Sequence, residues 1–436
     1  MFLYLFNGAV SKVKNIKHNG LKVFSQSTQM KKLIKISIII ILISGVLYFI
    51  NGVTRTHKMN AWQNKAGETL PDSFRIELPV IRNIGNWFCV RGSINDKYEV
   101  DFFIDTQANS LLKIETVNDL KSHYWGKFPA IVRNFYGQKG KDPLYYFDSF
   151  KIQSLSFQNP LFAGIYTNDA IYDIIENGVI GTNIIKQLYW KFSLDDDKMI
   201  LFSKKDSTLL CKETETYLKI ENGLNKSKIF FPDISTQDDF LFDLGYAGAI
   251  MVNKNIFTHL SELFSPQEYL YFNQVSLKND TTYVFDNVDV EWSSIKISNC
   301  QIIYSPITNR NLIGAKLMHR FNFVLAYNEK TNNRLRDNLY IQPRNNFQIF
   351  KCDPYCSDFG FFIRKIENEF IIKGVEIGGL AYKAGIGVKD KIVSIDNGNF
   401  DLNDYKRLDL YLSDKESVIL KIEKDGQVID INLINK

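Results

Sequence analysis

The sequence predicts a mainly β protein with two β-rich lobes related by duplication, a small C-terminal domain, and one N-terminal transmembrane helix. Residues 33–50 form an apolar run that directly follows a lysine-rich segment. From Phe74 onward, short alternating apolar runs are separated by turns, which is typical of antiparallel sandwiches and barrels. Two landmarks then recur in the same order at a similar spacing, as in internal duplications. A length of 436 residues fits several domains.

The positive charge lies almost entirely at the N-terminus. The chain has a net charge of +5, and residues 1–35 hold seven lysines and no acidic residue. Subtracting these seven charges from +5 leaves −2 for the rest of the chain. A nearly neutral folded part lacks the basic surface of a nucleic-acid-binding protein, so we expect no nucleic-acid partner.

The apolar run 33–50 reads LIKISIIIILISGVLYFI and contains no acidic residue. Such a helix approaches the ~30 Å thickness of a bilayer core. Because the lysines of segment 1–32 precede it and few basic residues follow, we expect a cytoplasmic N-terminus and an exported folded part, on the periplasmic or extracellular face. Met30, followed by two lysines, also resembles the start of a signal sequence, in which case residues 1–29 would be an upstream extension. A cleavable signal in place of an uncleaved anchor is the competing interpretation.

Three folded segments are expected after a polar tether over residues 51–73. The β-rich pattern fills residues 74–205, starts again over 213–342, and is followed by a compact segment at 355–436. Between the last two, Cys352 and Cys356 would either close a small disulfide loop or remain free thiols. No Cys/His spacing resembles a zinc site, and we expect no metal or cofactor.

The landmarks that recur are an aspartate and a glycine. VDFFIDTQANSLLKI places Asp105 at the end of an apolar strand, and VIG follows 76 residues later at Gly181. DFLFDLGYAGAIMV places Asp243 in the same position, and LIG follows 71 residues later at Gly314. Each glycine segment precedes a helical and then a strand-like pattern.

These motifs resemble the pepsin-like and retropepsin-like aspartic proteases, especially the bacterial two-lobed forms. The resemblance implies an acid-protease-like β-barrel in each lobe, with Asp105 and Asp243 as the catalytic pair. It also implies supporting roles for Thr106, Gly245, Gly181 and Gly314. The substrate would be an extended polypeptide.

The chemistry of such a pair follows from electrostatics. Two carboxylates held ~3 Å apart cannot both ionise, so they share one proton. The ionised carboxylate takes a proton from a bound water that attacks the peptide carbonyl. The protonated carboxyl donates to the developing oxyanion.

The sequence departs from the family pattern at two positions. Gln107 stands where the first lobe should have a glycine, and Leu244 stands where the second lobe should have a hydroxyl residue. In the family, that hydroxyl links the two turns beneath the carboxylates, and leucine cannot donate a hydrogen bond. A degenerate pair that binds peptide without cleaving it is therefore the alternative prediction.

A flap is expected between Asp105 and Gly181, since the family closes a β-hairpin over its substrate. The turn-rich span 133–140 lies in the right place, with Tyr136 covering the cleft and Gly137 allowing the tip to move. An ordinary exposed hairpin is the alternative.

The C-terminal segment 357–436 resembles a PDZ domain of the type found with bacterial proteases. Its carboxylate-binding loop and following strand would be Phe359, Gly360, Phe361 and Phe362, and its last two strands would form a hairpin about Asp425-Gly426. The resemblance implies a peptide ligand that adds a strand to an exposed sheet edge and presents its C-terminus to the loop. Lys389 stands where this pattern usually has a glycine.

Overall fold

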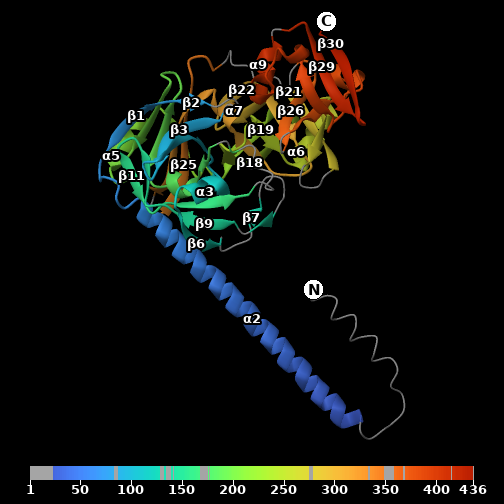
Figure 1. Cartoon of the computed structure of the whole chain (residues 1–436). Coiled ribbons are helices and arrows are strands. Elements are labelled where there is room, and N and C mark those ends of the chain that lie inside the picture. The colour runs from blue at the N-terminus through green and yellow to red at the C-terminus, as the bar shows by residue number, and fades with distance from the viewer. Residues whose placement is uncertain are drawn as a thin grey trace. The chain divides into compact units, whose positions relative to one another are not determined.

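A computed structural model describes residues 23–82, 87–127, 132–133, 139–140, 142–166, 175, 177–273, 278–331, 334–347, 358–366, 369–413 and 415–435. The chain divides into two compact units, Met1–Met59 and Asn60–Lys436. The second unit consists mainly of β-sheets, so the predicted mainly β class is confirmed (Figure 1).

Helix α2 (Val23–Ala66) contains the apolar run. From Ile34 onward it is, within the described part of the chain, the one helix long and apolar enough to cross a membrane. Side chains such as Leu42 and Leu47 are exposed to the surroundings along this helix. The prediction that a tether begins at residue 51 is wrong, because the helix continues to Ala66. Proline, which would stop a helix, first occurs after it, at Pro71.

The first sheet has ten strands, nine of them in the order β11-β10-β3-β4-β13-β5-β12-β9-β6, with β2 beside β3. Alternation explains these strands: in β10 the side chains of Phe150 and Ile152 are buried, and the lysine between them is not. A separate two-stranded sheet pairs β7 with β8. The bounds are β2 (Ile81–Arg82), β3 (Phe88–Ile94), β4 (Tyr98–Ile104), β5 (Leu111–Lys113), β6 (His123–Lys127), β7 (Val132–Arg133), β8 (Lys139–Gly140), β9 (Pro143–Tyr146), β10 (Ser149–Ile152), β11 (Leu155–Gln158), β12 (Leu161–Ile165), β13 (Val179–Ile180), and for the helices α3 (Ile114–Asp119) and α4 (Thr182–Ile185).

The second sheet has twelve strands and begins in the order β17-β18-β23-β19-β22-β21-β20. The bounds are β17 (Ser227–Phe231), β18 (Thr236–Asp243), β19 (Ile250–Val252), β20 (Gln267–Asn273), β21 (Lys278–Trp292), β22 (Ile295–Tyr304), β23 (Leu312–Gly314), and for the helices η2 (Pro232–Ile234), α6 (Lys254–Leu263) and α7 (Ala315–Met318).

The two sheets repeat one strand order. From β3 to β6 the first sheet runs β3-β4-β13-β5-β12-β9-β6, and each strand has a counterpart at the same place in the second. Strands β4 and β13 are parallel, as are β18 and β23. Val179 faces Phe103, two residues before Asp105, and Leu312 faces Leu241, two residues before Asp243. This matched register is compatible with the predicted two-lobed arrangement.

A six-stranded sheet joins the two halves of the chain, in the order β1-β15-β14-β24-β25-β16. Strand β14 pairs with β24, and the rings of Phe192 and Phe323 stack across this seam with centroids 4.4 Å apart. Each buried phenylalanine contributes about 1.5–3 kcal/mol, so this shared sheet holds the lobes together. The bounds are β1 (Arg75–Pro79), β14 (Tyr189–Ser193), β15 (Lys198–Phe202), β16 (Leu218–Ile220), β24 (Phe321–Thr331), β25 (Arg334–Pro343), and for the nearby helix α5 (Ser207–Thr214).

One hydrophobic core runs through both lobes. It extends from Phe88 in the first sheet, through Trp190 in the shared sheet, to Trp292 in the second. Residues of both halves are fully buried in it, so neither lobe has a separate core.

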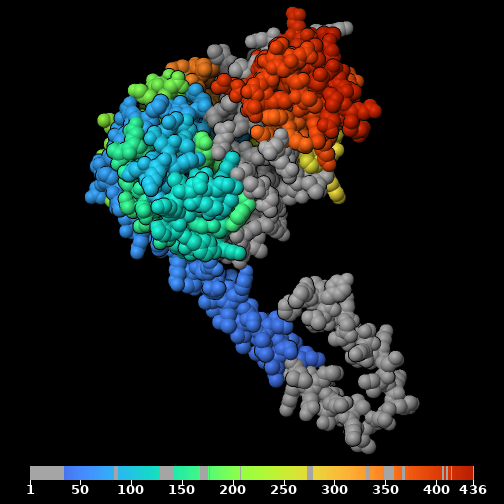
Figure 2. Space-filling model, viewed as in Figure 1, coloured from blue at the N-terminus to red at the C-terminus, as the bar shows by residue number. Residues whose placement is uncertain are grey.

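The C-terminal segment has its own core, formed around Phe359, Phe361 and Ile395. Figure 2 shows its residues, in orange and red, gathered into a compact mass. The predicted hairpin between β29 and β30 is present, with Asp425 and Gly426 in the left-handed region that such a tight turn needs. The bounds are β26 (Phe361–Ile366), β27 (Glu369–Glu376), β28 (Lys391–Ile395), β29 (Ser417–Lys424), β30 (Gln427–Ile434), and for the helices α8 (Leu380–Lys383), η3 (Asp396–Gly398), η4 (Leu402–Arg407) and α9 (Leu408–Ser413).

The C-terminal segment continues the second sheet. Strand β20 pairs with β27, where Leu270 faces Val375, and the Ile377 amide donates to the Glu268 carbonyl oxygen at 2.7 Å. Lys389 has a φ of 76°, a conformation that favours glycine. Its ammonium lies 4.3 Å from the ring centroid of Phe272 in β20, a cation–π contact that accounts for a lysine here.

Candidate active site

The two predicted aspartates lie on turns of the same construction. Asp105 directly follows β4, and its Oδ1 accepts hydrogen bonds from the amides of Gln107 at 2.7 Å and Ala108 at 2.8 Å. Asp243 ends β18, and its Oδ1 accepts from the Gly245 amide at 2.9 Å. In each turn, the aspartate thus accepts a hydrogen bond from the backbone amide two residues later.

The glycine segments pack against these turns in the same way. The amide of Thr182, just after Gly181, donates to the Ala108 carbonyl at 2.8 Å. The amide of Ala315, just after Gly314, donates to the Tyr246 carbonyl, also at 2.8 Å. Both acceptors lie three residues after their aspartate.

Glycine is required at both segments by close approach of the backbone. A side-chain carbon on Gly314 would overlap the Gly248 carbonyl and lie 2.5 Å from that of Tyr246. One on Gly181 would overlap the backbone of residues 108–110. Such overlaps with backbone atoms cannot be relieved by a side-chain rotation.

The Asp243 turn lies directly against the carboxylate of Asp105. A side-chain carbon on Gly245 would lie only 2.5 Å from the Asp105 carboxyl carbon, so the glycine makes room for that carboxylate. Both aspartates remain partly exposed. The structure therefore brings the two predicted acidic residues together, and Gly245 contacts both of them.

Burial and mutual repulsion act on the protonation of this pair. Desolvation raises the pKa of both carboxyls above the ordinary 3.8, against the lowering effect of the backbone amides. The pKa of Asp243 is raised well above 3.8, because the negative charge of Asp105 adds to desolvation. A pair of this kind holds a proton at a pH where isolated carboxyls have lost theirs.

Side chains of the first lobe link the two turns. The hydroxyl of Thr106 donates to the Phe242 carbonyl at 3.2 Å and accepts from the Leu244 amide at 3.0 Å. The Gln107 side-chain amide also donates to the Phe242 carbonyl, at 2.7 Å. Trp87 donates through Nε1 to the Gly245 carbonyl at 3.0 Å.

Tyr327 in β24 supports the first turn from the shared sheet. Its hydroxyl is buried and donates to the Thr106 carbonyl at 3.0 Å. The turn that holds Asp105 is therefore tied to the seam between the lobes.

Replacing Tyr327 by phenylalanine is expected to lower the free energy of unfolding by about 1–3 kcal/mol, since a buried carbonyl loses a donor. Urea unfolding measures this change. Tyr124→Phe, at an exposed tyrosine, is the control and should unfold like the wild type. Equal unfolding free energies for the Tyr327 variant and the wild type would contradict the supporting role.

The sequence did not indicate Trp87 and Tyr327 as site residues, and it did not indicate the role of Gln107. Trp87 and Tyr327 lie 158 and 221 residues from the positions they contact, and neither belongs to a motif. Gln107 was noted only as a departure from the family pattern, and no feature of the sequence indicates the hydrogen bond of its side chain.

The other predicted sites lie in the C-terminal segment or outside the described residues. Tyr136 and Gly137 of the predicted flap are outside them, as are Cys352 and Cys356. Phe359 and Phe361 are fully buried in the C-terminal core, and Phe362 is half-buried and packs toward Met251 and Tyr269 of the second sheet. Gly360 has a φ of 76° and its carbonyl accepts from the Glu376 amide.

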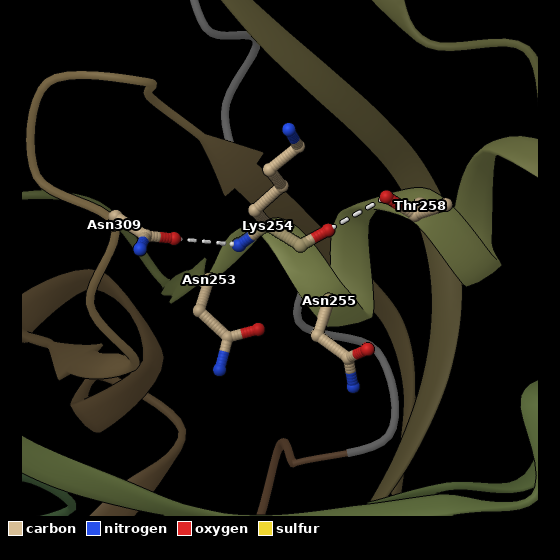
Figure 3. Close-up of a pocket in the computed structure, with 5 residues that line it drawn as sticks. All are labelled: Asn253, Lys254, Asn255, Thr258 and Asn309. Carbon is tan, nitrogen blue, oxygen red and sulfur yellow. Dashed lines mark hydrogen bonds between the residues drawn. The ribbon is translucent and has the colours of Figure 1, made fainter.

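A polar pocket lies at the start of helix α6 (Figure 3). Asn309 Oδ1 accepts from the Lys254 amide at 2.8 Å, and the Lys254 ammonium points away from the amides of Asn253 and Asn255. Asn253 is bound to Asp238, five residues before Asp243 on β18. The pocket is thus at the opposite end of that strand from the paired carboxylates.

No protein-family model matches the chain, and no curated protein matches it. The chain is similar to a retropepsin-like aspartic protease from Rickettsia conorii, with 17% sequence identity, over 30% of this chain and 94% of that one, at a TM-score of 0.22.

Proposed function

We propose that the chain is a membrane-anchored, exported aspartic endopeptidase that hydrolyses peptide bonds through Asp105 and Asp243. The main observation in favour of this function is that the Asp243 turn packs closely against the Asp105 carboxylate. The pKa of both carboxyls is raised. The matched strand order of the two sheets supports a duplicated acid-protease-like fold.

In the proposed hydrolysis, the ionised carboxyl of the pair would act as the general base and the protonated one as the general acid. Because the pKa of both carboxyls is raised, the pair would keep one proton that the two share. The ionised carboxylate would take a proton from a water between the two, and the water oxygen would attack the peptide carbonyl. The protonated carboxyl would donate to the carbonyl oxygen as negative charge develops there.

The C-terminal segment is proposed to act as a PDZ domain that docks peptides. Strand β26 pairs with β27 on one side, and among the described strands no other pairs with it. A peptide adding to this edge would lie near η4, which contacts β26. Gly360, in a left-handed conformation, would let the loop before β26 turn its amides toward a terminal carboxylate.

Membrane attachment through residues 33–50 is part of the proposal. Helix α2 supports it by length and composition, and the lysines that precede the apolar run favour export of the folded part.

A peptide-binding protein that does not cleave is the second candidate. The observation that favours it is Leu244, which is fully buried and supplies no hydroxyl to link the turns. Such a protein would bind extended polypeptide on the same scaffold and release it unchanged.

Cleavage of an unfolded protein, followed across pH, separates the two candidates. Because the pKa of both carboxyls is raised, we expect the acidic limb of the rate profile above pH 3.8 and an optimum in the weakly acidic range. A statine-type inhibitor, which mimics the tetrahedral intermediate, should block the reaction. Binding of the unfolded protein without turnover between roughly pH 3 and 8 would favour the scaffold instead.

A further inference from the structure

The links between the two turns are unequal. In the described hydrogen bonds to the second turn, the side chains come from the first lobe, from Trp87, Thr106 and Gln107. The second turn meets them with backbone groups of Phe242, Leu244 and Gly245, and Tyr327, which bonds the first turn from the second lobe, lies on β24 and not on the turn. In a duplicated site, each lobe would offer the same side chains to the other.

The missing side chain is at Leu244, the counterpart of Thr106. Thr106 follows Asp105 and Leu244 follows Asp243, so the two occupy matched positions. Leu244 is fully buried and apolar, and it belongs to the common core. One of two expected side-chain links between the turns is therefore lost.

The side-chain amide of Gln107 supplies a second link between the turns, to the Phe242 carbonyl that Thr106 also bonds. Its Nε2 lies 2.7 Å from the Phe242 carbonyl oxygen, closer than the Thr106 hydroxyl at 3.2 Å. Its backbone amide still donates to Asp105 Oδ1 at 2.7 Å. Gln107 therefore bonds both turns, its own through the backbone amide and the other through the side chain. Phe242 directly precedes Asp243, and a bond to its carbonyl fixes where the Asp243 turn begins.

We propose that Gln107 is a positioning residue, whose side-chain amide replaces the hydroxyl that Leu244 lacks and holds Asp243 in register with Asp105. The structural role of Gln107 does not depend on the proposed peptidase function. Its expected effect on catalysis does. The two departures from the family pattern, at Leu244 and Gln107, then compensate each other. The second turn loses a side-chain donor at Leu244, and the first turn gains one at Gln107.

The consequence for catalysis would lie in the turnover step. Positioning of the two carboxylates matters most when charge develops between them, so its loss lowers kcat more than it raises KM. Gln107 is exposed, and water competes for its bond, which limits the expected effect to that of an ordinary neutral hydrogen bond.

The test compares Gln107→Met, which keeps the length of the side chain but removes its donor, with Gln158→Met as a matched control. Gln158 is also exposed in the first lobe, but its amide bonds to Ser156 of its own strand. Amide hydrogen exchange at Leu244 and Gly245 reports on the second turn without requiring activity. Initial rates on an unfolded protein give kcat and KM.

For Gln107→Met we expect faster exchange at these two amides and a lower kcat, each by roughly two- to twelvefold, with KM nearly unchanged. The Gln158→Met variant should match the wild type in both. Adding Leu244→Thr to Gln107→Met should recover part of kcat, because it restores a hydroxyl at the second turn.

The outcomes separate this inference from the proposed function. Unchanged exchange at Leu244 and Gly245 in Gln107→Met would overturn the positioning role, even if the wild type cleaves. Faster exchange in a protein that shows no turnover would retain the link between the turns and refute the peptidase. If Gln107→Met and Gln158→Met lower kcat equally, the role in positioning is wrong.

Discussion

Asp105→Asn and Asp243→Asn are each expected to abolish peptide cleavage while making the folded chain more stable at neutral pH. Asparagine has nearly the shape of aspartate but can neither hold nor release the shared proton. Removal of one general acid or base typically lowers kcat by roughly 10²–10⁴-fold. Cleavage of an unfolded protein at the pH optimum measures this loss.

The stability change has a definite sign. The folded chain holds protons on these carboxyls more tightly than the unfolded chain, because their pKa is raised above 3.8. As the pH rises through 3.8 and up to the folded pKa values, ionisation of the pair therefore lowers the free energy of unfolding. An asparagine at either position removes the repulsion between the carboxylates, so the gain should be present at roughly pH 7 and absent at roughly pH 3.

Thermal unfolding at the two pH values tests this expectation, with Asp239→Asn as the control. Asp239 is exposed on the same strand as Asp243, four residues earlier, and its replacement should leave cleavage unchanged. Full cleavage by either active-site variant would refute the shared-proton mechanism. A variant that is inactive but less stable at neutral pH would point to a structural role instead.

Gly245→Ala is expected to lower kcat by about 10²-fold. The added methyl group would meet the Asp105 carboxyl carbon at 2.5 Å, so that carboxylate must move away from Gly245 and out of its position in the pair. A displacement of about 1 Å in a catalytic group can cost this much. The free energy of unfolding should fall by about 1–3 kcal/mol through overpacking.

The comparison for this variant is Gly387→Ala. At Gly387 the nearest atom to an added methyl group is Asp390 Oδ2 at 3.8 Å, an ordinary contact. That variant should keep both activity and stability. Wild-type kcat in Gly245→Ala would show that the two turns lie further apart than the structure places them.

Local patterns in the sequence predicted the strands and the two turns. The alternation in segments such as β10 and the apolar strands that end at Asp105 and Asp243 are readable because side chains on a strand face opposite sides in turn. The positions of Gly181 and Gly314 were readable too, because backbone packed this closely excludes any side chain.

Contacts between distant segments were beyond the sequence. The bonds of Trp87 and Tyr327 depend on how whole sheets meet, and no local pattern marks them. The end of helix α2 was missed because the polar residues after Ile50 are compatible both with a continued helix and with an irregular tether. The pairing of β20 with β27 joins segments about a hundred residues apart, and either strand alone resembles many others.

The strands β6 and β20, which occupy matching positions in the two sheets, differ in how their outer edges are protected. Strand β6 ends the first sheet, and it carries Lys127 and a register shift near Gly126, both of which discourage pairing with another molecule. Its counterpart β20 reads QEYLYFN, lacks both devices, and relies on β27 to satisfy its outer backbone groups. Without residues 358–435, the outer edge of β20 would be open to pairing with neighbouring chains, so we expect the C-terminal segment to protect the protein from aggregation as well.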